Sequence, residues 1–173
     1  MEKPTILVLS QPRFDSFCKE HNFTDESLND NKEINKNYAF ISIIGTPDCL
    51  KYYLDESDTE HWFKENHDNV INLEFDDLDF DIDFEGHLFK AMNEEQAKKL
   101  FEFIENNIGK TFIIHCRAGK SRSAAVGQFI KDFYPDVYGK LDLHWPTPNH
   151  CVYRLLSRQY YRKHKIFENN DGN

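Results

Sequence analysis

The sequence predicts an α/β fold, because strand-like apolar runs alternate along the chain with stretches of helical periodicity. Residues 38–44 and 111–114 are short apolar runs, and residues 69–75 alternate between apolar and polar side chains, which indicates strands. Residues 93–108 carry an apolar stripe at helical spacing. Hydrophobic residues make up 39% of the chain and include fifteen phenylalanines, which favours a folded globule over a disordered chain.

The first third of the chain is expected to begin with a buried strand at residues 5–9 and a short helix at residues 13–20. Gln11 and Pro12 are expected to turn the chain between them. Residues 22–37 are polar and indicate a loop. After the strand at 38–44, we expect one helical turn at 47–53 and an irregular, charged segment at 55–68. The expected anchors of these two irregular segments are Phe23, Leu28, Ile34, Trp62 and Phe63.

Helix signals dominate the second half of the chain. Asn93 is a suitable N-cap, and Gln96 stands at the capping-box position three residues later. Gly109 is expected to end that helix before the strand at 111–114. A second buried helix should follow from about residue 124 to Pro135, then a connection at 138–144. A last helix is expected to start with Thr147 or Asn149 as its cap.

The most informative stretch is residues 115–123, His-Cys-Arg-Ala-Gly-Lys-Ser-Arg-Ser. Cys116 stands where a strand should end, and Arg122 stands where a helix should begin. The five residues between them are enough for a loop that curls round one tetrahedral anion. The N–H groups of such a loop and the positive end of the helix favour phosphate, and the planar guanidinium of Arg122 can hold two phosphate oxygens. The sequence therefore predicts a phosphate site.

The same surroundings give Cys116 a chemical role. A thiol beside an arginine at a helix N-terminus favours its thiolate form, and a thiolate that faces phosphate is a nucleophile for phosphoryl transfer. Ser123 is placed to donate a hydrogen bond to the sulfur and help it leave, and His115 is expected to orient the loop through backbone contacts. The alternative is a buried cysteine before an ordinary helix, which the glycine, arginine and hydroxyl at these offsets disfavour.

These nine residues resemble the HCxxGxxRS signature of the cysteine-dependent protein tyrosine phosphatases, and the Ala-Gly-x-Ser-Arg-Ser form looks most like the dual-specificity branch. The resemblance extends over about residues 38–163. It implies a central mixed, mainly parallel sheet with helices on both faces, a cysteinyl-phosphate intermediate, no metal or other cofactor, and an aspartic acid on a separate loop as general acid. The substrate-binding loop that it implies comprises His115, Arg117, Ala118, Gly119, Lys120 and Ser121.

The general acid is expected just after the strand at 69–75, which by resemblance is the strand that precedes the acid loop. Asp77 lies in phase with Ile71, Leu73 and Phe75 and is our first choice. Asp76 is the second choice. Three further aspartates remain open, although a solvated loop charge is the more common role for each: Asp79, Asp81 and Asp83.

The acidic stretch from Asp76 to Gly86 does not fit a calcium loop. Counted from Asp79, the twelfth position is Lys90, and counted from Asp81 it is Met92, where an EF-hand needs glutamate. We expect instead a flap over the site, whose acidity repels polyanions and tolerates basic peptides. Its apolar side chains, which pack inward or onto the substrate, are Phe80, Ile82 and Phe84.

Arg117 and Lys120 support a different substrate class. Inositide phosphatases of the same superfamily carry two basic residues at these positions for the extra phosphates of the ring. A solvated role is equally plausible for Lys120. Three arginines at four-residue spacing on the last helix indicate an exposed charged face or a basic rim: Arg154, Arg158 and Arg162.

Length and composition set the remaining expectations. We expect one phosphatase domain over 1–173, with a catalytic core at about 38–165 and a flexible tail at 166–173. The net charge of −9 argues against nucleic acid as a partner, and no apolar run approaches the roughly 20 residues of a membrane span. Four widely spaced cysteines without a CxxC pair fit a reducing, cytoplasmic location: Cys18, Cys49, Cys116 and Cys151. Cys49 and Cys151 are expected to be core thiols, with a regulatory disulfide to Cys116 left open.

The resemblance thus implies a phosphatase that acts on phosphotyrosine in proteins, and it leaves open whether phosphoserine and phosphothreonine are further substrates. We expect the protein to be a monomer. One alternative is a phosphoinositide or inositol polyphosphate phosphatase. A second alternative is a catalytically weak phosphate-binding module that keeps the loop but lacks a correctly placed acid.

Overall fold

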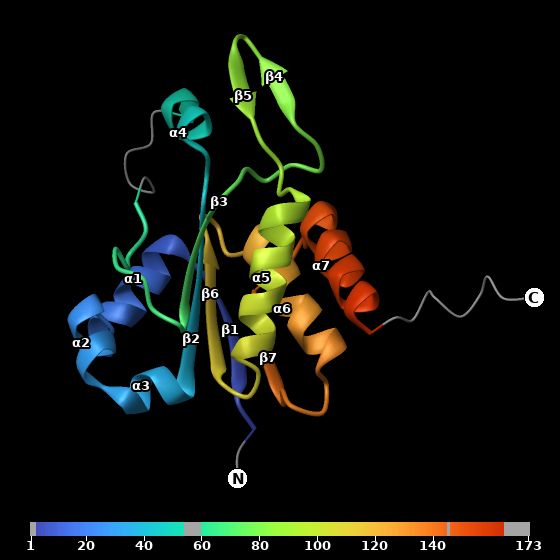
Figure 1. The fold of residues 1–173 in the computed structure, drawn as a ribbon. Coiled ribbons are helices and arrows are strands. Elements are labelled where there is room, and N and C mark those ends of the chain that lie inside the picture. The colour runs from blue at the N-terminus through green and yellow to red at the C-terminus, as the bar shows by residue number, and fades with distance from the viewer. Residues whose placement is uncertain (1–2, 54–59, 145, 165–173) are drawn as a thin grey trace, which may run out of the picture.

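The computed structural model describes residues 3–53, 60–144 and 146–164, and its centre is a five-stranded sheet (Figure 1). The strands lie in the order β3-β2-β6-β1-β7, and every neighbouring pair is parallel. Their bounds are β1 Thr5–Ser10, β2 Tyr38–Ile44, β3 Val70–Glu74, β6 Thr111–Cys116 and β7 Lys140–Asp142. The α/β class is confirmed. The expectation of a mixed sheet is wrong. Each connection between strands carries the chain back to the end of the sheet where the previous strand began, so all five strands run in the same direction.

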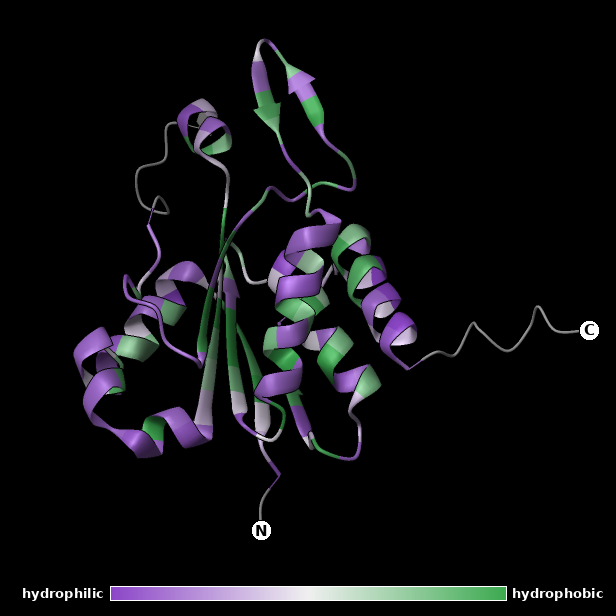
Figure 2. Ribbon diagram, viewed as in Figure 1, coloured by the Kyte–Doolittle hydropathy of each residue, from purple (hydrophilic) through white to green (hydrophobic). Residues whose placement is uncertain are grey.

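Helices cover both faces of this sheet (Figure 1). On one face lie α1 (Gln11–Glu20), α2 (Asp25–Asp30) and α3 (Lys32–Asn37), and on the other α5 (Glu94–Asn106), α6 (Arg122–Phe133) and α7 (His150–Lys163). Strand side chains alternate between the two cores: Phe112 and Ile114 pack in the core with α5 to α7, and Ile113 packs in the core with α1. Figure 2 shows the hydrophobic residues on the strands and on the inward faces of the helices.

Two capping boxes explain where two of the helices begin. The predicted box at α5 is confirmed, since Gln96 N donates to Asn93 Oδ1 at 2.8 Å and Asn93 N donates to Gln96 Oε1 at 3.1 Å. Thr24 and Ser27 form a second box at α2. The expectation of a loop at residues 22–37 is therefore wrong, because local side-chain caps stabilise two short helices there.

Two smaller expectations also need correction. Helix α1 begins at Gln11, so Gln11 and Pro12 do not turn the chain; proline is tolerated in the first helical turn because its missing N–H would have no intrahelical partner. The expected connection at 138–144 contains strand β7, which pairs with β1 through Lys140 to Asp142. The expected flexible tail at 166–173 lies outside the described residues.

The acidic stretch forms a two-stranded antiparallel hairpin of β4 (Ile82–Phe84) and β5 (His87–Phe89). Glu85 and Gly86 make its turn with φ angles of 52° and 79°, and two positive values in a two-residue turn match the twist of a hairpin. The hairpin projects above the carboxyl edge of the sheet beside α4 (Pro47–Tyr53), as Figure 1 shows.

Because the five strands are parallel, their carboxyl ends gather at one edge. The segment after β3, the loop between β6 and α6, and the start of α1 meet at this edge, where ligands of open α/β sheets usually bind. No helix among residues 3–53, 60–144 and 146–164 is long and apolar enough to cross a membrane.

Candidate active site

The loop between β6 and α6 packs directly against the end of β1. Gly119 adopts a φ of 69°, and a Cβ atom there would lie 2.5 Å from Leu9 C and Ser10 N. Gln11 N donates to the carbonyl oxygen of Arg117 at 3.1 Å and fixes the loop from the α1 side. Only glycine fits this left-handed position against a neighbouring backbone, so Gly119 sets the curvature that the sequence predicts.

Arg122 provides a buried positive charge at the first residue of α6. Its side chain is only 7% exposed, and Nη1 donates to Phe75 O at 2.7 Å. Its Nε is buried and has no hydrogen-bond partner within the described part of the chain. A buried guanidinium without a carboxylate partner is costly unless an anion binds it, so this geometry fits an oxyanion ligand.

Cys116 lies beside Arg122 in the lining of one pocket and is 2% exposed. Its Sγ is 3.0 Å from Ser123 Oγ, and Ser123 is itself fully buried on the first turn of α6. A hydroxyl at this distance can donate a hydrogen bond to a thiolate. The structure thus brings together the three residues that the sequence assigned to anion binding, attack and sulfur stabilisation.

His115 is buried beneath the loop and does not line the pocket. Its Nε2 is 2.7 Å from Ser42 Oγ, and the same hydroxyl is 2.6 Å from His61 Nδ1. Burial lowers the pKa of His115 to about 3 and that of His61 to about 4. The His115 ring is therefore held by the Ser42 side chain of β2, whereas backbone contacts were expected and Nδ1 has no hydrogen-bond partner among the described residues. Sequence reasoning missed the contacts that join Ser42, His61 and His115.

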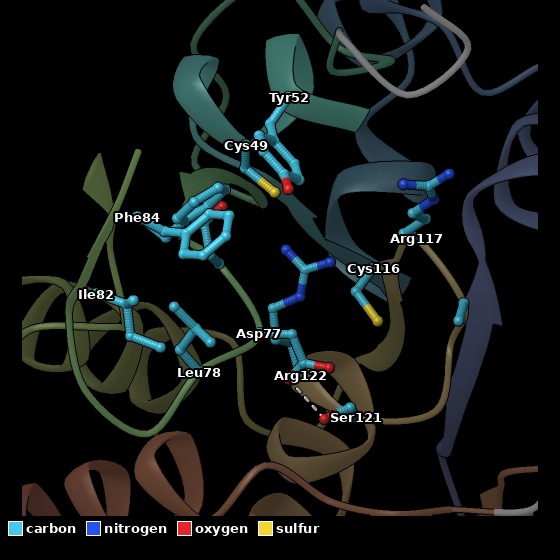
Figure 3. A pocket seen from close by; sticks show the side chains of 13 residues that line it. Cys49, Tyr52, Asp77, Leu78, Ile82, Phe84, Cys116, Arg117, Ser121 and Arg122 are labelled. Atoms are coloured by element: carbon cyan, nitrogen blue, oxygen red, sulfur yellow. Dashed lines mark hydrogen bonds between the residues drawn. The ribbon is translucent and has the colours of Figure 1, made fainter. Parts of the chain in front are cut away.

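Asp77 also lines the pocket, and the dashed line in Figure 3 marks its hydrogen bond with Ser121. Its Oδ1 accepts a hydrogen bond from Ser121 Oγ at 2.6 Å and another from Asn149 Nδ2 at 2.9 Å. Strand β3 ends at Glu74, so the strand phase used to select Asp77 does not extend to it. The contacts with Ser121 and Asn149 orient its carboxylate instead.

Asp76 has a different role from its neighbour. Its side chain is 3% exposed and accepts three hydrogen bonds, from Thr46 N at 2.9 Å, Thr46 Oγ1 at 2.7 Å and Lys90 N at 2.8 Å. These bonds join the ends of β2, β3 and β5 at the base of the hairpin. A carboxylate with this many structural bonds fixes the loop.

Two of the three other aspartates in the acidic stretch also make structural contacts. Asp79 Oδ1 accepts a hydrogen bond from Cys151 N at 3.2 Å, and Asp81 Oδ1 accepts one from Ala91 N at 2.9 Å. Asp83 lies on β4 with its side chain exposed. Among residues 3–53, 60–144 and 146–164, no group of three or more His, Cys, Asp or Glu side chains is arranged to hold a metal ion.

Asn149 also belongs to the site, although the sequence predicts it only as a possible helix cap. It caps α7 through Oδ1, which accepts from Val152 N at 2.9 Å, and its Nδ2 also donates to Leu78 O at 3.3 Å. Its own N–H donates to Ser121 O at 3.2 Å. Asn149 thus connects α7 and the acid loop through its side chain and the phosphate loop through its backbone N–H, and the cap signal alone does not reveal the contacts with the two loops.

The pocket has a volume of about 530 Å³ and two chemically different sides. One side is formed by the loop residues Cys116, Arg117, Ala118, Ser121 and Arg122; Gly119 and Lys120 do not line it. Figure 3 shows apolar side chains gathered on the other side. They are Tyr52, Leu78, Ile82, Phe84 and Phe89. Ile82 and Phe84 line the pocket, as expected, although Phe84 remains 47% exposed; Phe80 does not line it and is 70% exposed.

Two of the cysteines differ in placement. Cys151 belongs to the core, as expected, and its Sγ is 3.7 Å from Met92 O. Cys49 is only partly buried and lines the pocket, so its assignment to the core is wrong; it lies on the short helix α4, which stands above the sheet edge. Burial raises the pKa of the Cys49 thiol to about 11, with a further contribution from the nearby Asp76.

Comparisons of this chain with protein-family models, with curated proteins and with solved structures found no match.

Proposed function

We propose that this chain is a phosphatase that hydrolyses phosphotyrosine in proteins through a cysteinyl-phosphate intermediate, in a site like that of the dual-specificity phosphatases. The observation that carries the proposal is the buried Arg122 guanidinium, whose Nε lacks a partner in the described chain and which shares a pocket with Cys116. A nucleophile and an oxyanion-binding cation at the N-terminus of one helix are the parts that phosphoryl transfer needs.

In the first proposed step, Cys116 Sγ attacks phosphorus and forms the S–P bond while the P–O bond to the tyrosine oxygen breaks. Arg122 and the N–H groups at the start of α6 hold the equatorial oxygens and stabilise the charge of the transition state. Asp77 gives its proton to the leaving phenolate. Ser121 and Asn149 orient the Asp77 carboxyl group through their contacts with Oδ1.

In the second step, the Asp77 carboxylate takes a proton from water, and the water oxygen attacks phosphorus. The S–P bond breaks and inorganic phosphate forms. Ser123 donates a hydrogen bond to the departing sulfur, which favours the thiolate as a leaving group. The enzyme returns to its starting protonation state after phosphate leaves. A reducing, cytoplasmic location is proposed as well, because the mechanism needs Cys116 as a free thiol and the described cysteines are all free.

An inositide phosphatase is the second candidate function, favoured by Arg117, which lines the pocket. Lys120 is exposed and does not line it, so only one of the two basic residues expected for an inositide phosphatase lies at the pocket. The apolar side of the pocket suits an aromatic ring better than a ring that carries several phosphates.

The test is phosphate release from a matched panel of a phosphotyrosine peptide, a phosphothreonine peptide, phosphatidylinositol phosphates and soluble inositol polyphosphates. Cys116→Ser serves as the blank. Turnover of the phosphotyrosine peptide that disappears in the blank is the expected result. Turnover confined to inositides would favour the second candidate, and no phosphate release from any member of the panel would favour a phosphate-binding module.

A further inference from the structure

The large hydrophobic side chains that are exposed in the described chain lie on α4, on the hairpin or just before the hairpin. They are Tyr52 (39% exposed), Phe80 (70%), Phe84 (47%) and Leu88 (41%). Tyr52 and Phe84 line the pocket that contains Cys116, and Phe80 lies two residues from both Leu78 and Ile82, which also line it. Exposed apolar side chains concentrated in this way mark a surface that binds a partner.

The hairpin and α4 form one continuous wall. Tyr52 packs edge-on against Phe84, His87 and Phe89, with ring centroids 6.0, 5.5 and 5.5 Å apart. Leu88 N donates to Asp48 Oδ2 at 3.2 Å, which ties β5 to α4. In the hairpin register Ile82 is opposite Phe89 and Phe84 is opposite His87, so these residues share the face that meets Tyr52.

The charge of this wall is opposite to that of the phosphate loop. Residues 81–89 include Asp81, Asp83 and Glu85 but no lysine or arginine, and α4 adds Asp48 and Lys51, whose charges offset each other. Arg117 and Arg122 line the other side of the pocket. A ligand that fits both sides carries an anion at one end and apolar, positively charged groups at the other. Because Phe80 lies beyond the pocket lining, the wall extends farther than one phosphotyrosine side chain needs.

We propose that this wall, formed by α4 and residues 80–89, binds the peptide residues next to phosphotyrosine and selects substrates whose neighbouring residues are basic and apolar. The inference rests on the proposed function and specifies its partner. Apolar neighbours cover Phe80 and Phe84, and lysine or arginine neighbours lie within the field of Glu85 at the hairpin turn. Asp83 lies on the opposite face of β4 and adds to this field through the thin hairpin without contacting the peptide. Acidic neighbours and polyanionic inositol phosphates are disfavoured by the same field.

The experiment compares kcat/KM for three substrates: a phosphotyrosine peptide flanked by Arg and Leu, the same peptide flanked by Glu and Ser, and p-nitrophenyl phosphate, which has no flanking residues. We expect the basic, apolar peptide to exceed the acidic peptide by about tenfold at low salt, and the difference to shrink as salt screens the charges.

Two hairpin variants locate the effect. Asp83→Asn combined with Glu85→Gln is expected to reduce the preference for the basic peptide by about threefold, as expected for two exposed charges. Phe80→Ser is expected to lower the ratio of peptide to p-nitrophenyl phosphate kcat/KM several-fold. The matched control is Glu26→Gln with Asp30→Asn on α2, which removes the same charge from exposed positions on the far side of the sheet (Figure 1). Far-UV circular dichroism and the melting temperature verify that each variant is folded.

The outcomes separate this inference from the function on which it rests. Turnover of p-nitrophenyl phosphate with equal kcat/KM for both peptides would overturn the wall's role and leave the proposed function standing. Equal effects of the α2 control and the hairpin double variant would also overturn it, since net charge alone would then explain the preference. No Cys116-dependent turnover of any substrate would overturn the proposed function and the inference together.

Discussion

At the scale of single residues, the neighbouring carboxylates Asp76 and Asp77 have distinct environments. We predict that Asp77→Asn lowers kcat for a phosphotyrosine peptide by about 100-fold, because general acid catalysis typically contributes at least that much. The loss should be smaller for p-nitrophenyl phosphate, whose leaving group needs less protonation. The melting temperature should change little, since Asp77 is exposed. Equal loss on both substrates would argue against proton transfer by Asp77.

Asp76→Asn should act on stability instead. The Asp76 carboxylate accepts hydrogen bonds from Thr46 N, Thr46 Oγ1 and Lys90 N through its two oxygens. An asparagine side chain has only one oxygen and no charge, so these donors lose part of their hydrogen bonding. We expect a loss of about 1–3 kcal/mol in the free energy of unfolding, measured by urea denaturation. Activity per folded molecule should stay closer to wild type than in Asp77→Asn. A stable Asp76→Asn protein with no turnover would instead identify Asp76 as the acid.

Ser42→Ala tests the buried contact beneath the phosphate loop. The variant leaves the Nε2 of His115 and the Nδ1 of His61 without the hydroxyl that lies 2.7 and 2.6 Å from them. We expect a loss of about 1–3 kcal/mol in the free energy of unfolding. Ser157→Ala is the control, because that hydroxyl donates to Tyr153 O within a helix turn and touches no site residue. If both variants lost the same free energy of unfolding, the Ser42–His115 contact would contribute no more to stability than a hydrogen bond within a helix turn.

At the scale of elements, the phosphate loop depends on a glycine that approaches β1. Gly119→Ala is expected to displace the loop, since its Cβ would lie 2.5 Å from the backbone of β1. A misplacement of about 1 Å in the catalytic groups can lower turnover by about 100-fold, and we expect a loss of at least that size in kcat/KM. Gly109→Ala is the matched control, because its φ of 93° is also positive but its Cβ would meet nothing within 4 Å. Similar losses of activity in both variants would contradict a local effect.

The sequence predicts elements with strong local signals better than those without them. The α5 helix has both a capping box and an apolar stripe, and its start is therefore predicted correctly at Asn93. Strand β7 has three residues and pairs only with β1, so residues 138–144 give no periodic signal. The α2 helix was missed because Ser27, instead of glutamate or glutamine, completes its capping box.

The candidate site shows the same limit at longer range. Cys116, Arg122 and Ser123 lie within eight residues of one another, and their spacing alone predicts one anion site. The contact of Asn149 with Asp77 joins residues 72 apart, and Ser42 meets His115 across 73 residues. Such contacts depend on strand order and helix packing, which single-residue patterns do not encode.

At the scale of the whole molecule, the buried His115 and the partly buried His61 predict how stability depends on pH. Their folded-state pKa values, about 3 for His115 and about 4 for His61, lie below the ordinary value of 6.5. The unfolded chain therefore binds more protons as pH falls below about 6.5, and stability should fall with it. Each histidine contributes about 1.4 kcal/mol per pH unit in this range.

Urea denaturation at pH 7 and pH 5 measures this effect. We expect the free energy of unfolding to be lower at pH 5 by up to roughly 4 kcal/mol, which is the sum for two histidines over about 1.5 pH units. NMR of the imidazole rings should show His61 and His115 still neutral at pH 5. Protonated rings in the folded protein at pH 5 would contradict the account.

The central claim, that Cys116 is a phosphoryl-accepting nucleophile, is tested most directly by acid quenching during turnover of a phosphotyrosine peptide, followed by mass spectrometry of proteolytic fragments. We predict one phosphoryl group on the fragment that contains Cys116 in the wild-type protein, with no such adduct and no phosphate release in Cys116→Ser. Phosphate release that persists in Cys116→Ser, or turnover by the wild-type protein with a phosphoryl group on another residue, would contradict the claim.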